Sequence, residues 1–189
     1  SEAPRYEEFE DVFHYDLRQT LNAMDYGWLL NEYPSIANPT GTKMYGPHNM
    51  AMFSYADIDL MYYPEFDKAD LATLRVTVWE AELLARIGNW VTTWERELPE
   101  EDYSAGIIVR ALADGVISID ELTEDTVSHE RIIQSIHNAD LEETFLQEWE
   151  HLYQELVETR YQTSSVDLDS YVRGMNTVFN LHMESRGEK

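Results

Sequence analysis

Three polar residues, spaced four apart, are the first candidates for chemistry in this chain. Asn89, Thr93 and Glu97 lie in the stretch GNWVTTWERE, residues 88–97. A spacing of four places them on successive turns of one helix face. An amide oxygen, a hydroxyl and a carboxylate are hard oxygen donors that suit Mg²⁺, which keeps several waters and takes few protein ligands. The stretch therefore indicates a magnesium site if these side chains face a cavity, and a solvated helix surface if they do not.

The helix that must position these residues is expected over 67–97, with Asp67 as its cap and Pro99 beyond its end. At about 100° per residue, two more polar residues join the three within an arc of roughly 80°. We call this set the polar stripe: Glu82, Arg86, Asn89, Thr93 and Glu97. Apolar side chains flank it on both sides, which is typical of a central helix whose polar stripe lines a cavity. The alternative is a solvated seam in which Glu82 and Arg86 form an ordinary i,i+4 ion pair.

The rest of the chain shows helical periodicity and predicts an all-α helical bundle in one domain, 1–189. Helices are expected over 6–32, 47–63, 103–114 and 167–185, and the segment 33–43 interrupts them with Pro34, Pro39 and Gly41. SIDE at 118–121 reads as a capping box. Residues 128–161 carry one long helix or two, with a joint near Asn138. GVISID at 115–120 is the one strand-like segment.

Composition excludes several classes of function. Thirty-seven acidic residues face 13 basic ones, and the net charge of −24 repels nucleic acid and anionic lipid. No apolar run reaches the roughly 20 residues of a membrane span, and the absence of cysteine excludes disulfides and zinc–thiolate sites. We expect a cytoplasmic protein from a halophilic source, because molar salt screens such self-repulsion. The start at Ser1 in place of Met is expected to reflect processing or trimming.

The motif N-x-x-x-T-x-x-x-E on a long helix resembles the second metal motif of class I terpene synthases. In that family the motif binds Mg²⁺ that carries the diphosphate of an isoprenoid substrate. Arg96 matches a basic residue that is common before the final Glu, whereas Trp90 stands where the family usually has Asp. A second resemblance is the pair Arg160 and Tyr161, 71 residues after Asn89, which matches an Arg–Tyr pair that holds the diphosphate.

The resemblance implies an isoprenoid synthase fold and a Mg²⁺-dependent carbon–oxygen lyase. Asn89, Thr93 and Glu97 would hold the metal, while Arg160, Tyr161 and Arg96 would bind an isoprenoid diphosphate and assist its ionisation to an allylic cation. Lys43 is either a further diphosphate contact or a surface charge on a loop. Four aromatic residues either steady the cation or belong to the core: Phe53, Trp79, Trp90 and Trp94.

One part of the family pattern has no counterpart at the expected distance. The family's aspartate-rich metal motif lies well over a hundred residues before the triad, but only 88 residues precede Asn89. EEFED (Glu7, Glu8, Asp11) and YADID (Asp57, Asp59) are too close and are expected to be solvated surface. The chain is therefore expected to be a C-terminal portion of a larger fold, a reduced relative without catalysis, or a chain that completes its site in a homo-oligomer or with a partner chain.

Two other readings stay open. A carboxylate-bridged di-iron bundle needs two Glu-x-x-His motifs; Glu148–His151 is one such pair and Asp11–His14 is an imperfect second. An acidic α-helical interaction domain without catalysis needs no special residue. The other histidines show no ligand spacing, and we expect them to be structural or surface residues: His48, His129, His137 and His182.

Overall fold

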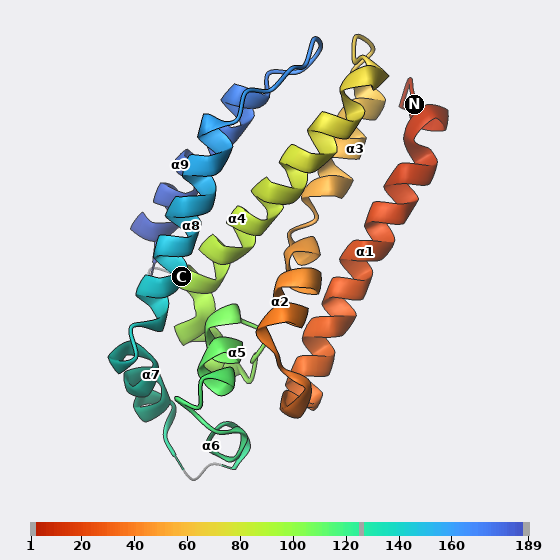
Figure 1. Cartoon of the computed structure of the whole chain (residues 1–189). Helices are drawn as coiled ribbons and strands as arrows, with labels where there is room; N and C mark the ends of the chain where they lie inside the picture. The colour runs from red at the N-terminus through yellow and green to blue at the C-terminus, as the bar shows by residue number, and fades with distance from the viewer. Residues whose placement is uncertain (1–2, 125–126, 187–189) are drawn as a thin grey trace.

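The computed structural model describes residues 3–124 and 127–186, and the described chain is mostly helical, with no strand (Figure 1). The elements follow in chain order: α1 (Tyr6–Glu32), η1 (Pro34–Ile36), α2 (Pro39–Tyr45), η2 (Gly46–Met50), α3 (Met52–Tyr62), η3 (Lys68–Asp70), α4 (Leu71–Glu97), η4 (Leu98–Glu100), α5 (Gly106–Ala113), α6 (Ile119–Thr123), α7 (His129–Asn138), α8 (Leu141–Glu158) and α9 (Leu168–Glu184). The prediction of an all-α bundle is confirmed.

α4 is the central helix of the bundle, as its two apolar faces predict. In Figure 1 it runs between α1 and α3 on one side and α8 and α9 on the other. Leu84, Ile87, Trp90 and Trp94 are at most 1% exposed and form the middle of the main core, which α5, α7 and α8 complete. A smaller cluster around Phe9 joins α1 to the end of α3. Because α4 is packed on most sides, its polar stripe has to face other parts of the protein.

The ends of several helices follow their local sequence signals. The side chain of Asp67 accepts a hydrogen bond from the amide of Ala69 and starts the turn that leads into α4. Ser118 and Glu121 form the expected capping box at the start of α6. The joint expected near Asn138 is present, because Asp140 adopts a left-handed conformation with φ of 52° between α7 and α8. The long segment 128–161 therefore forms two helices.

Three segments differ from the expected boundaries. The interrupted stretch 33–43 contains the start of α2, because Pro39 occupies a first-turn position and the side chain of Asn38 caps the helix. The helix expected over 47–63 is divided into η2 and α3 at Ala51, whose φ is 56°. GVISID forms no strand, and α6 begins at Ile119. None of the helices in the described ranges combines the length and apolar character that crossing a membrane requires.

Candidate functional site

The polar stripe of α4 is largely enclosed by the protein. Arg86 is 8% exposed, and the side chain of Glu97 is 17% exposed. The Thr93 hydroxyl donates a hydrogen bond to the carbonyl oxygen of Asn89 at 2.8 Å, as hydroxyls on helices often do. Its oxygen retains lone pairs that can serve another partner. The alternative of a stripe facing bulk solvent therefore does not describe these residues.

Arg86 is the unusual member of the stripe. Its Nη1 donates to the Asn89 amide oxygen at 2.6 Å, and its guanidinium carbon lies 5.4 Å from the centre of the Trp90 ring. Its Nε is buried and has no hydrogen-bond partner in the described part of the chain. Burial lowers the pKa of Arg86, although the charges of Glu97 and Asp102 oppose this shift. A buried guanidinium with an unused donor is costly, and an anion bound beside it would lower that cost.

A hollow of about 280 Å³ lies beside Arg86, between α1 and α4, and we call it the α1–α4 hollow. Its walls carry polar groups from four segments and an apolar side from α1: Ala23, Met24, Tyr26, Gly27, Trp28, Leu30, Asn31, Thr42, Gly46, Asn49, Arg86, Asp102 and Ser104. The Tyr26 and Thr42 hydroxyl oxygens are buried and lack hydrogen-bond partners among the described residues. Tyr26, Thr42 and Arg86 therefore all line one hollow and each has an unused polar atom, although the protein itself covers these three atoms.

Glu97 and Asp102 place negative charge near the α1–α4 hollow. Burial raises the pKa of Glu97, the charge of Asp102 adds to this effect, and Thr93, Arg86 and Arg96 oppose it. The backbone joins the two acidic residues, because the amide of Asp102 donates to the carbonyl oxygen of Glu97 at 3.1 Å. Of the residues that offer hard oxygen donors, Asp102 lines the α1–α4 hollow, whereas Asn89, Thr93 and Glu97 lie beside it and are not part of its wall.

The structure brings some of the expected substrate residues close to the stripe and leaves others far from it. Arg96 is half exposed, and its Nη2 lies 3.7 Å from Glu97 Oε1. The Tyr161 hydroxyl donates to the carbonyl oxygen of Leu156 at 3.0 Å, and its side chain lies near Glu80 of α4. Glu80 precedes Asn89 by nine residues, which is about 14 Å and half a turn around the helix. Tyr161 and the adjoining, exposed Arg160 are therefore on the opposite side of α4 from Asn89.

The other charged candidates lie outside the hollow. Lys43 lies on α2, not on a loop, and pairs with Glu148 of α8. His151 is exposed on α8, and Asp11 and His14 are exposed on α1 at the other side of the molecule (Figure 1). These two pairs do not converge on a common interior, so they do not form the four-helix carboxylate arrangement that a di-iron site requires.

The expectation that Asp57 of YADID is solvated surface is wrong. Asp57 is 2% exposed, not solvated, and lies between α1 and α4. Arg75 donates two hydrogen bonds to Asp16, of 2.6 and 2.9 Å, and its Nη1 is 3.9 Å from Asp57 Oδ1. Asp59 is exposed, as expected, and so are Glu7, Glu8 and Asp11. Asp57 therefore belongs to a buried ionic group that fastens three helices together.

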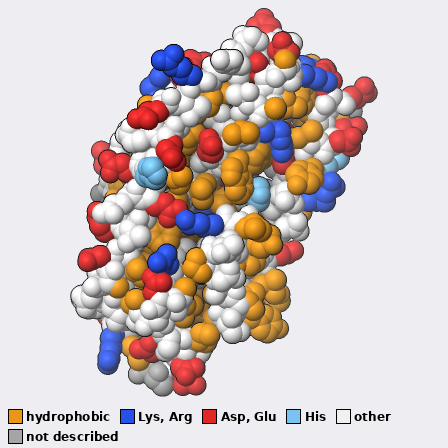
Figure 2. Space-filling view, viewed as in Figure 1, with side chains coloured by type: hydrophobic (Ala, Val, Ile, Leu, Met, Phe, Trp, Pro, Cys, Tyr) orange, Lys and Arg blue, Asp and Glu red, His pale blue; other side chains and the backbone are white. Residues whose placement is uncertain are grey.

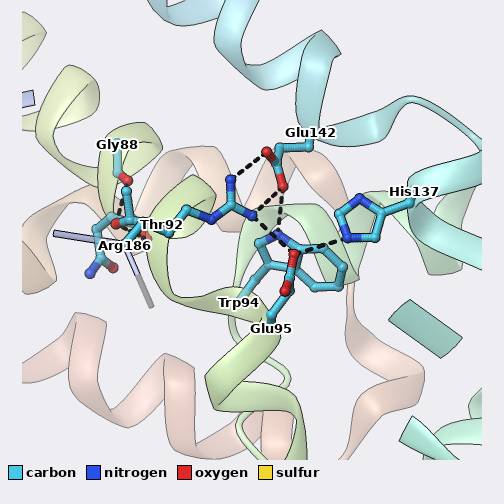
Figure 3. A network of polar contacts seen from close by, with 8 residues as sticks. Gly88, Thr92, Trp94, Glu95, His137, Glu142 and Arg186 are labelled. Carbon is cyan, nitrogen blue, oxygen red and sulfur yellow. Dashed lines mark hydrogen bonds and ion pairs between the residues drawn. The ribbon is translucent and has the colours of Figure 1, made fainter. Parts of the chain in front are cut away.

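A second cluster that could hold a metal lies at the same end of α4, on a different face of the helix from Thr93 and Glu97. Ligand atoms of Glu95, His137 and Glu142 lie within 4.8 Å of one another. Figure 3 shows the Arg186 guanidinium between the two carboxylates. It donates to both oxygens of Glu142 at 2.6 Å and to Glu95 at 3.0 Å. Arg186 already compensates these charges, so the cluster is an ion-pair network that fixes the end of α9 against α4 and α8.

A larger hollow, of about 530 Å³, lies between α3, α4 and the start of α9. Its walls are mostly apolar and tyrosine side chains, and its charged groups are Asp59 and Asp167. A hollow with acidic groups and no cationic one is unsuited to a diphosphate. The smaller α1–α4 hollow combines a buried cation, unused hydroxyls and neighbouring carboxylates, so it is the better candidate despite its size.

Sequence reasoning missed several partners of the stripe. Glu82 is fully buried, and its Oε1 accepts a hydrogen bond from the amide of Met52 at 3.0 Å. His48 Nδ1 lies 3.0 Å from Glu82 Oε2, outside hydrogen-bond geometry. Glu82 therefore does not form the expected ion pair with Arg86, and this leaves Arg86 available to the hollow. The position of Arg86 on the polar stripe was the one sequence signal for this site, since Thr42 and Asp102 come from distant segments of the chain.

Comparison with family models, curated proteins and solved structures finds no match to this chain.

Proposed function

We propose that the α1–α4 hollow binds a diphosphate together with Mg²⁺, and that the ligand is an isoprenoid diphosphate. The observation that carries this proposal is the burial of Arg86 at the wall of the hollow, with Nε unpaired. Arginine suits phosphate oxygens because its planar guanidinium offers donors in a fixed fork. A diphosphate oxygen beside Nε would supply the acceptor that the protein does not.

The unused hydroxyls support the same class of ligand. Tyr26 and Thr42 line the hollow from α1 and α2, and each hydroxyl can donate one hydrogen bond to an anionic oxygen. In a chain with a net charge of −24, an anion needs such local compensation to bind. Arg86 with two hydroxyl donors provides it on one side of the hollow.

Asn89, Thr93, Glu97 and Asp102 would hold the metal, with Asp102 at the wall of the hollow and the other three residues beside it. All four offer oxygen donors, and the mutual repulsion of Glu97 and Asp102 favours a divalent cation between them. A divalent cation held by these residues would supply positive charge that stabilises the departing diphosphate. Arg160 and Tyr161 are not part of this proposal, because Arg86 supplies the cationic contact on the correct face of α4.

The reaction that we propose is ionisation of the ligand. Its carbon–oxygen bond breaks, the electron pair leaves with the diphosphate, and an allylic cation remains. Arg86 would stabilise the departing charge by hydrogen bonds that strengthen as the charge grows. Met24, Trp28 and Leu30 form the apolar side of the hollow and would hold the hydrocarbon. At about 280 Å³ the hollow lies at the lower limit of ordinary ligand sites, so we propose a short prenyl chain.

Thermal unfolding tests the binding step directly. Wild-type protein is melted alone, with Mg²⁺, with pyrophosphate, and with both at saturating concentration. Linkage predicts that only the combination stabilises the fold, by about 3 kcal/mol at 100 times the dissociation constant, or roughly 5–10 °C in Tm for a chain of this size. The Glu97→Gln variant should lose most of this gain. A similar shift with pyrophosphate alone would contradict the metal-dependent site.

We further propose a cytoplasmic location and a salt-rich source, both of which the acidic composition supports. A role as an acidic interaction domain is a second candidate. Exposed apolar residues on α1 favour it, and no response to Mg²⁺ and pyrophosphate in the melts would point to it.

A further inference from the structure

α1 carries a row of large apolar side chains that the described chain leaves uncovered. Leu17, Leu21, Met24 and Trp28 are 38%, 52%, 56% and 59% exposed. Their spacing of four, three and four places them within an arc of roughly 60° on the helix. This is the spacing of alternating d and a positions in a heptad, the pattern by which one helix packs along another. We call these four residues the apolar stripe of α1.

The apolar stripe is separate from the face by which α1 packs on its own bundle. Phe9, Asp16, Ala23 and Leu30 form that face and are 1–4% exposed. α1 lies at the edge of the bundle in Figure 1, and Figure 2 shows hydrophobic side chains gathered over α2 and the C-terminal part of α1. A continuous exposed apolar patch on a strongly charged protein marks a contact surface.

We propose that the apolar stripe packs antiparallel against the same stripe of a second copy of this chain. In antiparallel helix pairs an a residue packs against a d residue of the other helix. One register satisfies this rule for all four residues at once. Leu17 of each copy packs on Trp28 of the other, and Leu21 of each copy packs on Met24 of the other. A two-fold axis passes between residues 22 and 23, so the interface is self-complementary, as a two-fold dimer requires.

Charge complementarity in this register supports a second copy as the occupant. Arg18 and Asp25 are exposed and follow the d residues of two successive heptads. In the proposed register Arg18 of each copy lies beside Asp25 of the other, between the same two apolar layers, and the axis produces this pair twice. At the outer ends Asp11 of one copy approaches Glu32 of the other. This repulsion, added to a net charge of −24 on each copy, predicts a dimer that strengthens as salt is added.

The dimer would also affect the α1–α4 hollow, and this consequence rests on the function proposed above. Met24 and Trp28 belong both to the apolar stripe and to the wall of the hollow. Leu21 and Leu17 of the second copy would cover these two side chains and shield the hydrocarbon side of the site from water. Each copy would thereby complete the other's hollow.

Sedimentation velocity of the full chain tests the dimer without any ligand, so its outcome is independent of the diphosphate proposal. The wild type is expected to be a monomer–dimer mixture whose dimer fraction rises between 0.15 M and molar KCl. Leu21→Glu/Met24→Glu is expected to be monomeric with an unchanged circular dichroism spectrum and Tm, since both residues are more than half exposed. The matched control Val76→Glu alters a residue of similar exposure, 59%, on α4 and should leave the dimer intact.

A charge swap tests the register. Arg18→Glu and Asp25→Arg each replace two attractions by two repulsions and should weaken the dimer roughly tenfold. The double variant Arg18→Glu/Asp25→Arg re-creates both pairs with reversed sign and should restore the dissociation constant to within about threefold. A wild type that stays monomeric in molar KCl, or a dimer that survives Leu21→Glu/Met24→Glu, overturns the proposal. A double variant that is as weak as the single ones overturns the antiparallel register.

Discussion

The carboxyl group of Asp57 is expected to make the stability of this protein fall as the pH rises from about 4 to 7. Asp57 lies 2% exposed beside Asp16, and Arg75 gives its two hydrogen bonds to Asp16. Burial, followed by the hydrogen bond and charge of Asp16, raises the pKa of Asp57 to about 7, and the charge of Arg75 opposes this. Asp57 is therefore protonated in the folded protein at pH 5 and charged at pH 8.

The sign of the effect follows from proton binding. In the unfolded chain Asp57 titrates near its ordinary pKa of 3.8. Between that value and 7 the folded state binds more protons than the unfolded state, so the free energy of unfolding decreases as the pH rises through this window. A pKa difference of about 3 corresponds to roughly 4 kcal/mol as an upper limit. Screening by solvent and by Arg75 reduces this to about 1–3 kcal/mol.

Asp57→Asn removes the charge and keeps the shape. The amide group can donate to Asp16, as the protonated carboxyl group does. The variant is expected to match the wild type near pH 4, to become progressively more stable than it as the pH rises, and to exceed it by about 1–3 kcal/mol at pH 7 and above, which is roughly 2–10 °C in Tm. Thermal melts across pH 4–8.5 at constant ionic strength measure this, with Asp59→Asn, an exposed neighbour on α3, as the control. Parallel pH profiles for the wild type and Asp57→Asn would show that Asp57 does not have a raised pKa in the folded protein.

Three further predictions concern the core, the ion-pair network and salt. A Cβ added at Gly106 would lie 2.6 Å from Trp90 Cε3, so Gly106→Ala should cost about 1–3 kcal/mol in chemical unfolding; an unchanged midpoint would show that this contact is not tight. Burial alone would raise the pKa of Glu142, but the hydrogen bonds from Arg186 and Trp94 lower it overall. Arg186→Gln should therefore lower the free energy of unfolding by about 1–3 kcal/mol at pH 7, with a smaller loss below pH 4. An equal loss at both pH values would show that the charge of Glu142 is not what Arg186 stabilises. With a net charge of −24, Tm should rise steadily from 0.1 M to molar KCl as repulsion is screened; a falling Tm would argue against a salt-adapted surface.

Much of the fold could be predicted because local patterns and packing agree. The two apolar faces of the helix over 67–97 predicted its central place, and α4 occupies that place. The cap at Asp67, the box at Ser118 and the joint near Asn138 depend on residues close together in the chain, so the sequence contains the whole signal. These features do not depend on which helices later become neighbours.

The parts that could not be predicted depend on distant residues. Asp57 is buried because α1 and α4 enclose it, and its neighbours Asp16 and Arg75 are 41 residues before and 18 residues after it in the chain. Glu82 turns away from Arg86 because the amide of Met52 and the ring of His48 engage it. The hollow needs Thr42 and Asp102 from segments on either side of α4 in the sequence. The periodicity of a single helix does not predict contacts between residues so far apart in the chain.

Calorimetric titration tests the claim that Arg86 faces a site for a diphosphate carried by Mg²⁺. Pyrophosphate is titrated into the wild type with Mg²⁺ and into three variants. Arg86→Gln should weaken binding about 10–100-fold, Tyr26→Phe should weaken it less while keeping the fold, and Arg110→Gln, which alters an exposed arginine on α5, should bind as the wild type does. No heat of binding in the wild type, or equal affinity in Arg86→Gln and Arg110→Gln, would contradict the claim.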